Sequence, residues 1–99
     1  MPTEPLSDIA IQRELGTLPG WARRGNALTK TFAFRSFAEA VGFVTRVADA
    51  ATAAEHYPDI DVRQTRVVVA LSTDAAGARI TPADVALARK VEQAAAVRG

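Results

Sequence analysis

Apolar and polar positions recur with two different periods along this chain, and the change of period marks its predicted helices and strands. Between residues 27 and 35, where only Lys30 breaks the pattern, and again between 66 and 73, apolar side chains recur at every second position, the spacing of half-buried strands. Between residues 37 and 55, and again between 82 and 97, they recur every three or four positions, which is the helical period. The pattern therefore predicts a chain built from both kinds of element.

The N-terminal part is predicted to hold a helix followed by a β-hairpin. The helix covers residues 8–15, with Ser7 as its N-cap. The hairpin has a short strand that opens at Trp21, a turn at Gly25-Asn26, and a second strand over residues 27–35. The side chains of the second strand that share one apolar face are Leu28, Phe32 and Phe34.

Two longer helices carry the stripes expected to face the core. Ser36 and Glu39 form a capping box, which starts a helix that ends at about Glu55. The last helix begins after Thr81 as its N-cap and runs to about Val97. The expected core-facing residues are Phe37, Val41, Val44, Ala48 and Ala51 in the first of these helices, and Val85, Ala88, Val91 and Ala95 in the second.

A second hairpin is predicted between these two helices. Residues 59–64 alternate with Ile60 and Val62 facing in, and residues 66–73 form the next strand. The link between these strands contains no Gly or Pro, so no turn type is predicted for it. The resulting order is α-β-β-α-β-β-α, and short antiparallel hairpins with helices on one face make an α+β, two-layer fold.

Composition and charge narrow the classes of function. The 99 residues predict one domain over 1–99, in which residues 1–6 form a loose N-terminal lead, and 48% hydrophobic residues suffice for a core. A net charge of +1 gives no reason to expect a nucleic-acid partner. The chain has no cysteine, and its single histidine argues against an all-protein zinc site. No targeting segment or membrane-spanning stretch is visible, so we expect a cytoplasmic protein without a membrane partner.

The single histidine, His56, lies where the long helix is predicted to end and a strand to begin. A histidine at a helix C-terminus faces the negative end of the helix dipole, which favours a positively charged imidazole. Such a residue suits proton transfer or contact with an anion. The alternative interpretation is a solvated histidine that only caps the last carbonyl groups of the helix.

Several segments of the sequence, in order and over nearly the whole chain, are similar to one known family. These segments are Leu18-Pro19-Gly20-Trp21, Phe32 to Phe37, Phe43 to Ala48, His56-Tyr57-Pro58-Asp59, Ala70 to Asp74, and Ile80 to Ala88. In these motifs the chain resembles the pterin-4a-carbinolamine dehydratases. The resemblance implies a four-stranded antiparallel sheet with three helices on one face. It also implies dehydration of 4a-hydroxytetrahydropterin to quinonoid dihydropterin in tetrahydrobiopterin recycling, with the pterin as substrate and no metal or redox cofactor.

The family motif has two adjacent histidines before a proline, a third histidine after the last strand, and an acidic residue in the last helix. In this chain His56 matches the first histidine, Pro58 the proline and Asp84 the acid. Tyr57 and Asp74 stand at the positions of the second and third histidines. The resemblance therefore implies an active site of the same kind with impaired activity.

A histidine–carboxylate pair between His56 and Asp74 is the expected catalytic core, in which the carboxylate orients the imidazole. The expected substrate-binding residues are Tyr57, Pro58, Asp59 and Asp84. Three of these residues also have structural interpretations. Tyr57 can be a packing ring, Asp74 can make an Asx-turn, and Asp84 can act only in capping the last helix.

A second hypothesis is a non-catalytic protein on the same fold, because fold alone does not fix function. The resembled family includes a dimerisation cofactor of a transcription factor and an accumulation factor for RuBisCO, which implies a protein partner. A third hypothesis is a pterin binder without turnover.

The resemblance also implies a homodimer or homotetramer. The chain is small, and its strands at 21–24 and 66–73 are expected to include an exposed edge, which is consistent with an oligomer.

Overall fold

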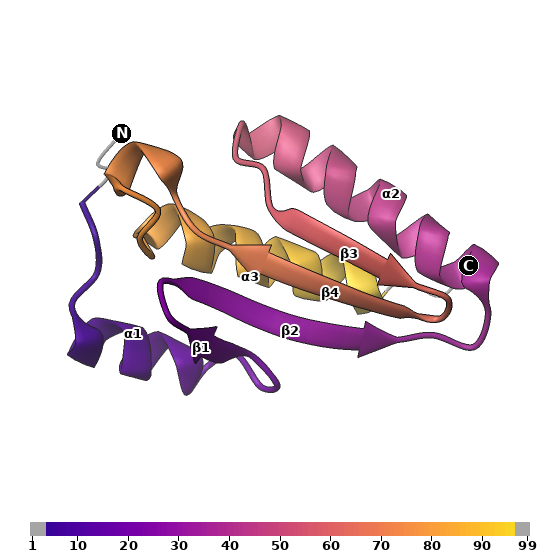
Figure 1. The fold of residues 1–99 in the computed structure, drawn as a ribbon, viewed down its shortest axis with the longest axis horizontal. Coiled ribbons are helices and arrows are strands. Elements are labelled where there is room, and N and C mark those ends of the chain that lie inside the picture. Colours follow the sequence, from indigo (N-terminus) through magenta and orange to yellow (C-terminus); the bar gives the residue numbers. More distant parts are fainter. Residues whose placement is uncertain (1–3, 97–99) are drawn as a thin grey trace.

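A computed structural model describes residues 4–96 as a four-stranded antiparallel sheet with helices packed on one face (Figure 1). The helices and strands are α1 (Asp8–Leu15), β1 (Ala22–Arg24), β2 (Ala27–Ala33), α2 (Phe37–Ala54), β3 (Asp59–Arg63), β4 (Arg66–Leu71), the short 3-10 helix η1 (Asp74–Ala76) and α3 (Pro82–Ala96). The predicted α+β fold and its α-β-β-α-β-β-α order are confirmed. Two expected ends, Met1 to Thr3 of the lead and Val97 of the last helix, lie outside the described residues.

The strands lie in the order β1-β2-β4-β3, which places β4 inside the sheet. Alternation along β2 and β4 turns Leu28 towards the helices beside Leu71, and Phe32 beside Val67. Strands β1 and β3 form the two edges. Of the two strands that were expected to include an exposed edge, β1 is an edge and β4 lies inside the sheet.

Helix α2 turns a different side to the core from the one that the sequence suggested. Its buried residues are Ala40, Phe43, Val47 and Ala51. Phe37 and Val41 are 60% and 43% exposed, so only part of the predicted stripe faces inward. The helix has apolar residues on two sides. The side that contains Phe43 faces the core, because its ring packs against Phe32 and Phe34, with ring centroids 4.8 and 5.0 Å away.

The predicted helix caps explain where α1 and α2 begin. The Ser7 hydroxyl accepts the backbone N–H of Ala10, and the Ser36 hydroxyl accepts that of Glu39. The link between β3 and β4 is a tight turn at Gln64-Thr65, in which Gln64 has a φ of 55°. Turns of this kind are usually recognised by a glycine or asparagine at the left-handed position. Gln64 occupies it here, so the sequence contains no signal for the turn. None of the helices among residues 4–96 is long and apolar enough to cross a membrane.

Candidate active site

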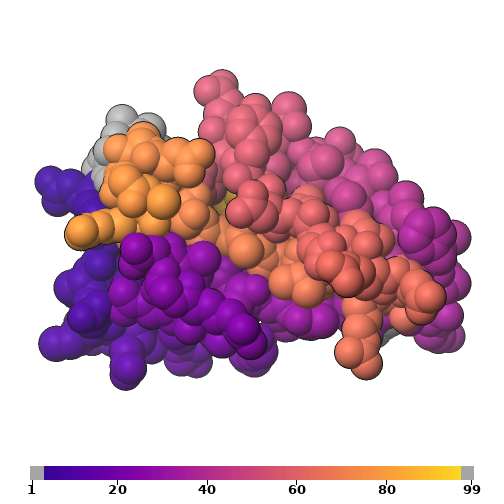
Figure 2. Space-filling model, viewed as in Figure 1, coloured from indigo at the N-terminus to yellow at the C-terminus, as the bar shows by residue number. Residues whose placement is uncertain are grey.

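A pocket of about 670 Å³ lies at the end of the molecule where α2 stops and α3 starts. Three segments surround it, namely residues 54–57 at the end of α2, residues 72–75 after β4, and residues 81–83 at the start of α3. Figure 2 shows the pocket as a hollow between the surface around η1, drawn in orange, and the pink surface at the end of α2. The pocket thus gathers residues that lie far apart in the sequence.

The end of α2 places the only histidine at this pocket. Glu55 adopts a left-handed conformation with a φ of 52°, and its backbone N–H donates to Thr52 at 3.2 Å. The backbone N–H of His56 donates to the carbonyl oxygen of Ala51 at 3.1 Å, which closes the helix in the manner of a C-terminal capping motif. Pro58 follows and cannot continue the helix. The chain therefore reverses at Glu55, and the His56 side chain is directed to α3.

The start of α3 supplies the carboxylate. Thr81 is the N-cap, because its hydroxyl accepts the backbone N–H of Ala83 at 3.2 Å. The Asp84 side chain reaches back, and its Oδ2 accepts the backbone N–H of Thr81 at 2.8 Å. This reciprocal arrangement is a capping box with aspartate as the acidic residue. It supplies a backbone donor to a carboxylate that is completely buried.

His56 and Asp84 meet across the two helix ends. Nε2 of His56 lies 2.5 Å from Oδ1 of Asp84, and Oδ2 of Asp84 also accepts the hydroxyl proton of Thr73 at 2.8 Å. When Asp84 is a carboxylate, both of its oxygens accept, and Nε2 of His56 is assigned the proton that it donates to Oδ1. In a neutral imidazole, Nδ1 then keeps its lone pair.

The predicted pairing of His56 with Asp74 is wrong. In the part of the chain that the structure describes, no hydrogen bond joins these two side chains, and His56 contacts Asp84 instead. Asp74 is exposed at the pocket wall, because the chain enters the short helix η1 directly after Thr73. The carboxylate that the sequence analysis assigned only to substrate binding is thus the one that orients the imidazole.

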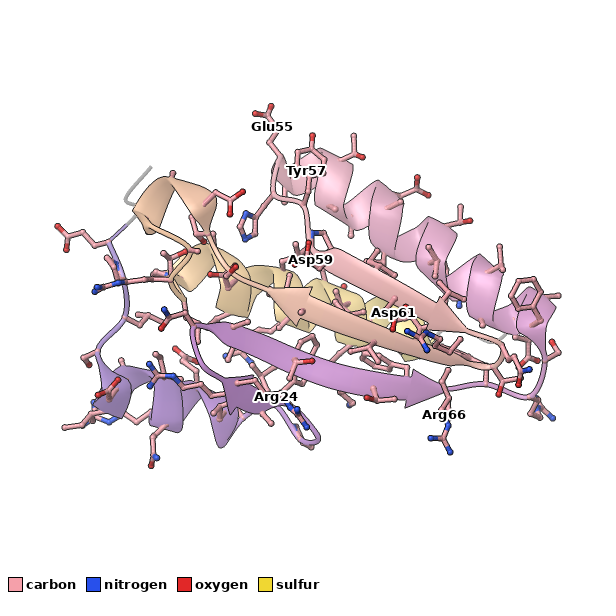
Figure 3. The ribbon with its side chains drawn as sticks, viewed as in Figure 1. Arg24, Glu55, Tyr57, Asp59, Asp61 and Arg66 are labelled. Atoms are coloured by element: carbon pink, nitrogen blue, oxygen red, sulfur yellow. The ribbon has the colours of Figure 1, made fainter. Side chains whose placement is uncertain are left out.

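The other predicted site residues divide between the pocket and the sheet. Tyr57 lines the pocket and is 68% exposed, and Figure 3 shows it at the outer end of α2 near Glu55. Pro58 shapes the turn but does not line the pocket. Asp59 is exposed on β3, where alternation turns it to the opposite face of the sheet from Ile60. The structure therefore gives no support for Asp59 as a substrate-binding residue.

Two buried threonines belong to the site although the sequence analysis did not include them in it. Thr73 and Thr81 are buried, and their hydroxyl oxygens lie 2.8 Å apart beside Asp84. The spacing from Thr81 to Asp84, typical of a capping box, was the one sequence signal that could have linked them. Among residues 4–96 no group of three metal-ligating side chains comes together.

Comparison with known proteins identifies the family of this chain. The sequence profile of the family described as Pterin 4 alpha carbinolamine dehydratase matches residues 4–94. The chain belongs to this family. A relative from Thermomicrobium roseum, named for pterin-4-alpha-carbinolamine dehydratase, is 48% identical over 91% of this chain and 96% of its own length. A relative of the same name from Nocardia farcinica is 44% identical over 96% of this chain and 99% of its own.

Two solved structures extend the family comparison to other roles. A transcriptional coactivator/pterin dehydratase from Brucella melitensis superposes with a TM-score of 0.88 at 30% identity, covering 93% of this chain and 99% of that one. A pterin dehydratase-like protein, described as a RuBisCO assembly factor in the α-carboxysome, superposes with a TM-score of 0.68 at 26% identity, covering 80% and 93%. The structural similarity therefore extends to proteins of this family that are described by roles other than dehydration.

Proposed function

We propose that this protein catalyses the loss of water from a 4a-hydroxytetrahydropterin and releases a quinonoid dihydropterin. In this reaction the bond between C4a and the hydroxyl oxygen breaks, N5 loses its proton, and a double bond forms between C4a and N5. The proton taken from N5 is passed to the departing hydroxyl group, which leaves as water. One group that accepts and then returns a proton is therefore sufficient, and no oxidant or reductant is needed.

His56 is the acid–base residue in this proposal. Its Nε2 is engaged by Asp84, so Nδ1 is the nitrogen left to exchange a proton with the substrate. Imidazole is suited to the task because it both accepts and donates protons near neutral pH. The observation that carries the proposal is a histidine that lines a pocket of about 670 Å³ and is paired with a completely buried carboxylate.

Tyr57 and Asp74 have supporting roles at the pocket wall. Both line the pocket, and both stand where the family motif has histidine. The Tyr57 hydroxyl can donate to and accept from the polar edge of a pterin, and the Asp74 carboxylate can accept from its N–H groups. Neither side chain replaces the acid–base chemistry of a histidine, so the proposed activity is slow relative to a site with three histidines.

An assay of the purified protein with 4a-hydroxytetrahydropterin tests the proposed function. We expect dehydration faster than in buffer, and a further gain of roughly tenfold or more in the double variant Tyr57→His/Asp74→His, because each added acid–base group can contribute up to about 10²–10⁴-fold. The matched control is Asp61→Asn, an exposed carboxylate on β3 away from the pocket. A wild-type rate equal to the buffer rate would refute the proposed activity of this chain.

The proposed assembly is a homo-oligomer that covers the outer side of α2. Phe37 and Val41 lie one turn apart there and are exposed, and Ala48 continues the same side of the helix. Isolated exposed apolar residues are common, but two large ones in line on one helix favour a covered surface. A second copy of the chain is the proposed occupant, since a small fold gains from burying this surface.

We expect the double variant Phe37→Glu/Val41→Glu to reduce the oligomer to a smaller species, because four like charges then meet across a two-fold interface. Sedimentation velocity or light scattering after gel filtration measures the mass. Ile9→Glu is the control, since Ile9 on α1 is 67% exposed but lies on another surface. An unchanged mass in the α2 variant, or an equal loss in the control, contradicts this interface.

A second candidate function is partner binding without catalysis. The observation that favours it is the similarity to the RuBisCO assembly factor, together with the exposed Tyr57 in place of a histidine. Co-elution of the purified protein with RuBisCO, compared with the Tyr57→Ala variant, tests it directly. Co-elution that depends on Tyr57, in a protein that dehydrates the pterin no faster than buffer, is the expected result for this function.

A further inference from the structure

We propose that Thr73 is a positioning residue, which acts through Asp84 to fix the protonation of the His56 imidazole. This inference rests on the proposed dehydratase function for its kinetic consequence, but its geometric part stands on the hydrogen bonds alone. Thr73 is buried just beyond the end of β4, and its hydroxyl lies between the carboxylate of Asp84 and the hydroxyl of Thr81.

The backbone of Thr73 is held from several sides. Its N–H donates to the carbonyl oxygen of Arg79 at 2.9 Å, and its own carbonyl oxygen accepts the N–H groups of Ala76 and Ala78 at 3.1 and 3.0 Å. Through these hydrogen bonds, Thr73 holds together the two ends of the loop that contains η1. The Thr73 side chain therefore extends from a fixed backbone position, although Thr73 lies beyond the end of β4.

The directions of the hydrogen bonds in this cluster are determined by their donors. The N–H of Ala83 can only donate, so the Thr81 oxygen accepts from it. An anionic Asp84 can only accept, so the Thr73 hydroxyl donates its single proton to Oδ2. The contact of 2.8 Å between the two threonines then requires Thr81 to donate to Thr73.

The result is a one-way chain of donors that begins at the N-terminus of α3 and ends on the carboxylate. Each bond in such a chain strengthens the next, because the groups polarise one another in the same direction. Together with the backbone N–H of Thr81, the Thr73 hydroxyl occupies Oδ2 of Asp84 and leaves Oδ1 for His56. Thr73 thus holds the carboxylate in the orientation that keeps the proton on Nε2.

The consequence for the imidazole is a defined tautomer. Among the described residues no buried side-chain nitrogen or oxygen lacks a partner, and no protein group bonds Nδ1 of His56. Nδ1 is therefore accessible at the pocket, in keeping with the partial exposure of the His56 side chain. If the Asp84 carboxylate rotated away from this orientation, both tautomers of His56 would be populated. Nδ1 would then have a free lone pair in only a fraction of the molecules.

The test uses the fact that His56 is the only histidine, so its ring nitrogens give unambiguous signals in 15N NMR of the full chain. In the wild type we expect one pyrrole-type and one pyridine-type nitrogen in the neutral imidazole. Thr73→Val keeps the shape of the side chain but removes its hydroxyl. We expect its two 15N shifts to move towards each other and kcat to fall roughly 10- to 100-fold with little change in KM, the size of one charged hydrogen bond.

Thr73→Ser is the rescue variant, because it keeps the hydroxyl and loses only a methyl group. We expect wild-type 15N shifts and a kcat close to that of the wild type. Equal impairment of the serine and valine variants, with both folded by circular dichroism, means that Thr73 acts through packing and overturns the proposal. Unchanged 15N shifts in Thr73→Val overturn it as well.

The outcome separates this inference from the proposed function. If the wild type dehydrates the pterin no faster than buffer, the function fails, while the 15N shifts of the wild type and both variants still decide whether Thr73 fixes the imidazole. If the wild type is active and the shifts are insensitive to Thr73, the function holds and the positioning role fails.

Discussion

Replacing His56 by alanine is expected to lower the rate of pterin dehydration by about 10²–10⁴-fold, the usual contribution of a general acid–base residue. His56 is the only histidine, and its Nδ1 is the nitrogen that the buried carboxylate leaves free. The rate, followed by the absorbance of the quinonoid product over a range of substrate concentrations, separates kcat from KM. We expect kcat to carry the loss.

The control for this variant is His56→Gln. A glutamine side chain can still donate an N–H to Asp84 at the position of Nε2, but it cannot exchange a proton with the substrate. We therefore expect His56→Gln to be as slow as His56→Ala and more stable, since alanine leaves Asp84 with one donor fewer, at a cost of about 1–3 kcal/mol. Activity close to the wild type in either variant would exclude His56 as the acid–base residue.

Replacing Asp84 by asparagine is expected to reverse the tautomer of His56 without removing any atom of the imidazole. The amide oxygen can keep the bonds from Thr73 and Thr81, which leaves the amide N–H₂ facing Nε2. Nε2 must then accept, so the proton moves to Nδ1, the nitrogen at the pocket. With this base blocked, the kcat of the proposed dehydration should fall by roughly 10²–10⁴-fold.

Two measurements on the Asp84→Asn variant check this prediction. In 15N NMR, the pyrrole-type and pyridine-type signals of His56 should exchange positions, and the kinetic loss should accompany that exchange. The matched control is Asp59→Asn, which removes an exposed carboxylate outside the pocket and should leave both the signals and the rate unchanged. A slow variant with the wild-type tautomer would assign the loss to the missing charge of Asp84 and not to the imidazole.

Local sequence signals were sufficient for the elements of this fold. The hydroxyls of Ser7 and Ser36 accept the backbone N–H groups expected of N-caps, and the turn at Gly25-Asn26 joins β1 to β2. These features depend on residues three or four positions apart, so the sequence alone contains the required information. The rotation of α2 was not predictable in this way, because apolar residues occupy two of its sides and the packing of Phe43 against distant aromatic rings selects one.

The site was predictable in its residue types but not in its pairing. His56 and Asp84 are 28 positions apart, and their contact depends on how the end of α2 and the start of α3 are placed by the sheet between them. From spacing alone Asp74 was an equally reasonable partner. The chain turns into η1 directly after Thr73, and Asp74 is therefore not the residue that contacts His56. The Ala-rich loop contains no residue whose local propensity predicts this turn.

The hydrogen bonds that orient the imidazole are the same ones that begin α3, and this has a consequence for how such sites change. Loss of Asp84 or Thr81 removes a helix cap as well as support for the proposed catalytic histidine. Exposed positions such as Tyr57 and Asp74 can be exchanged at little cost in stability. A descendant that had abandoned the chemistry would therefore still keep its threonine and its aspartate. The residues that distinguish a catalytic protein from a non-catalytic one are therefore those at the rim of the pocket, because stability does not constrain them.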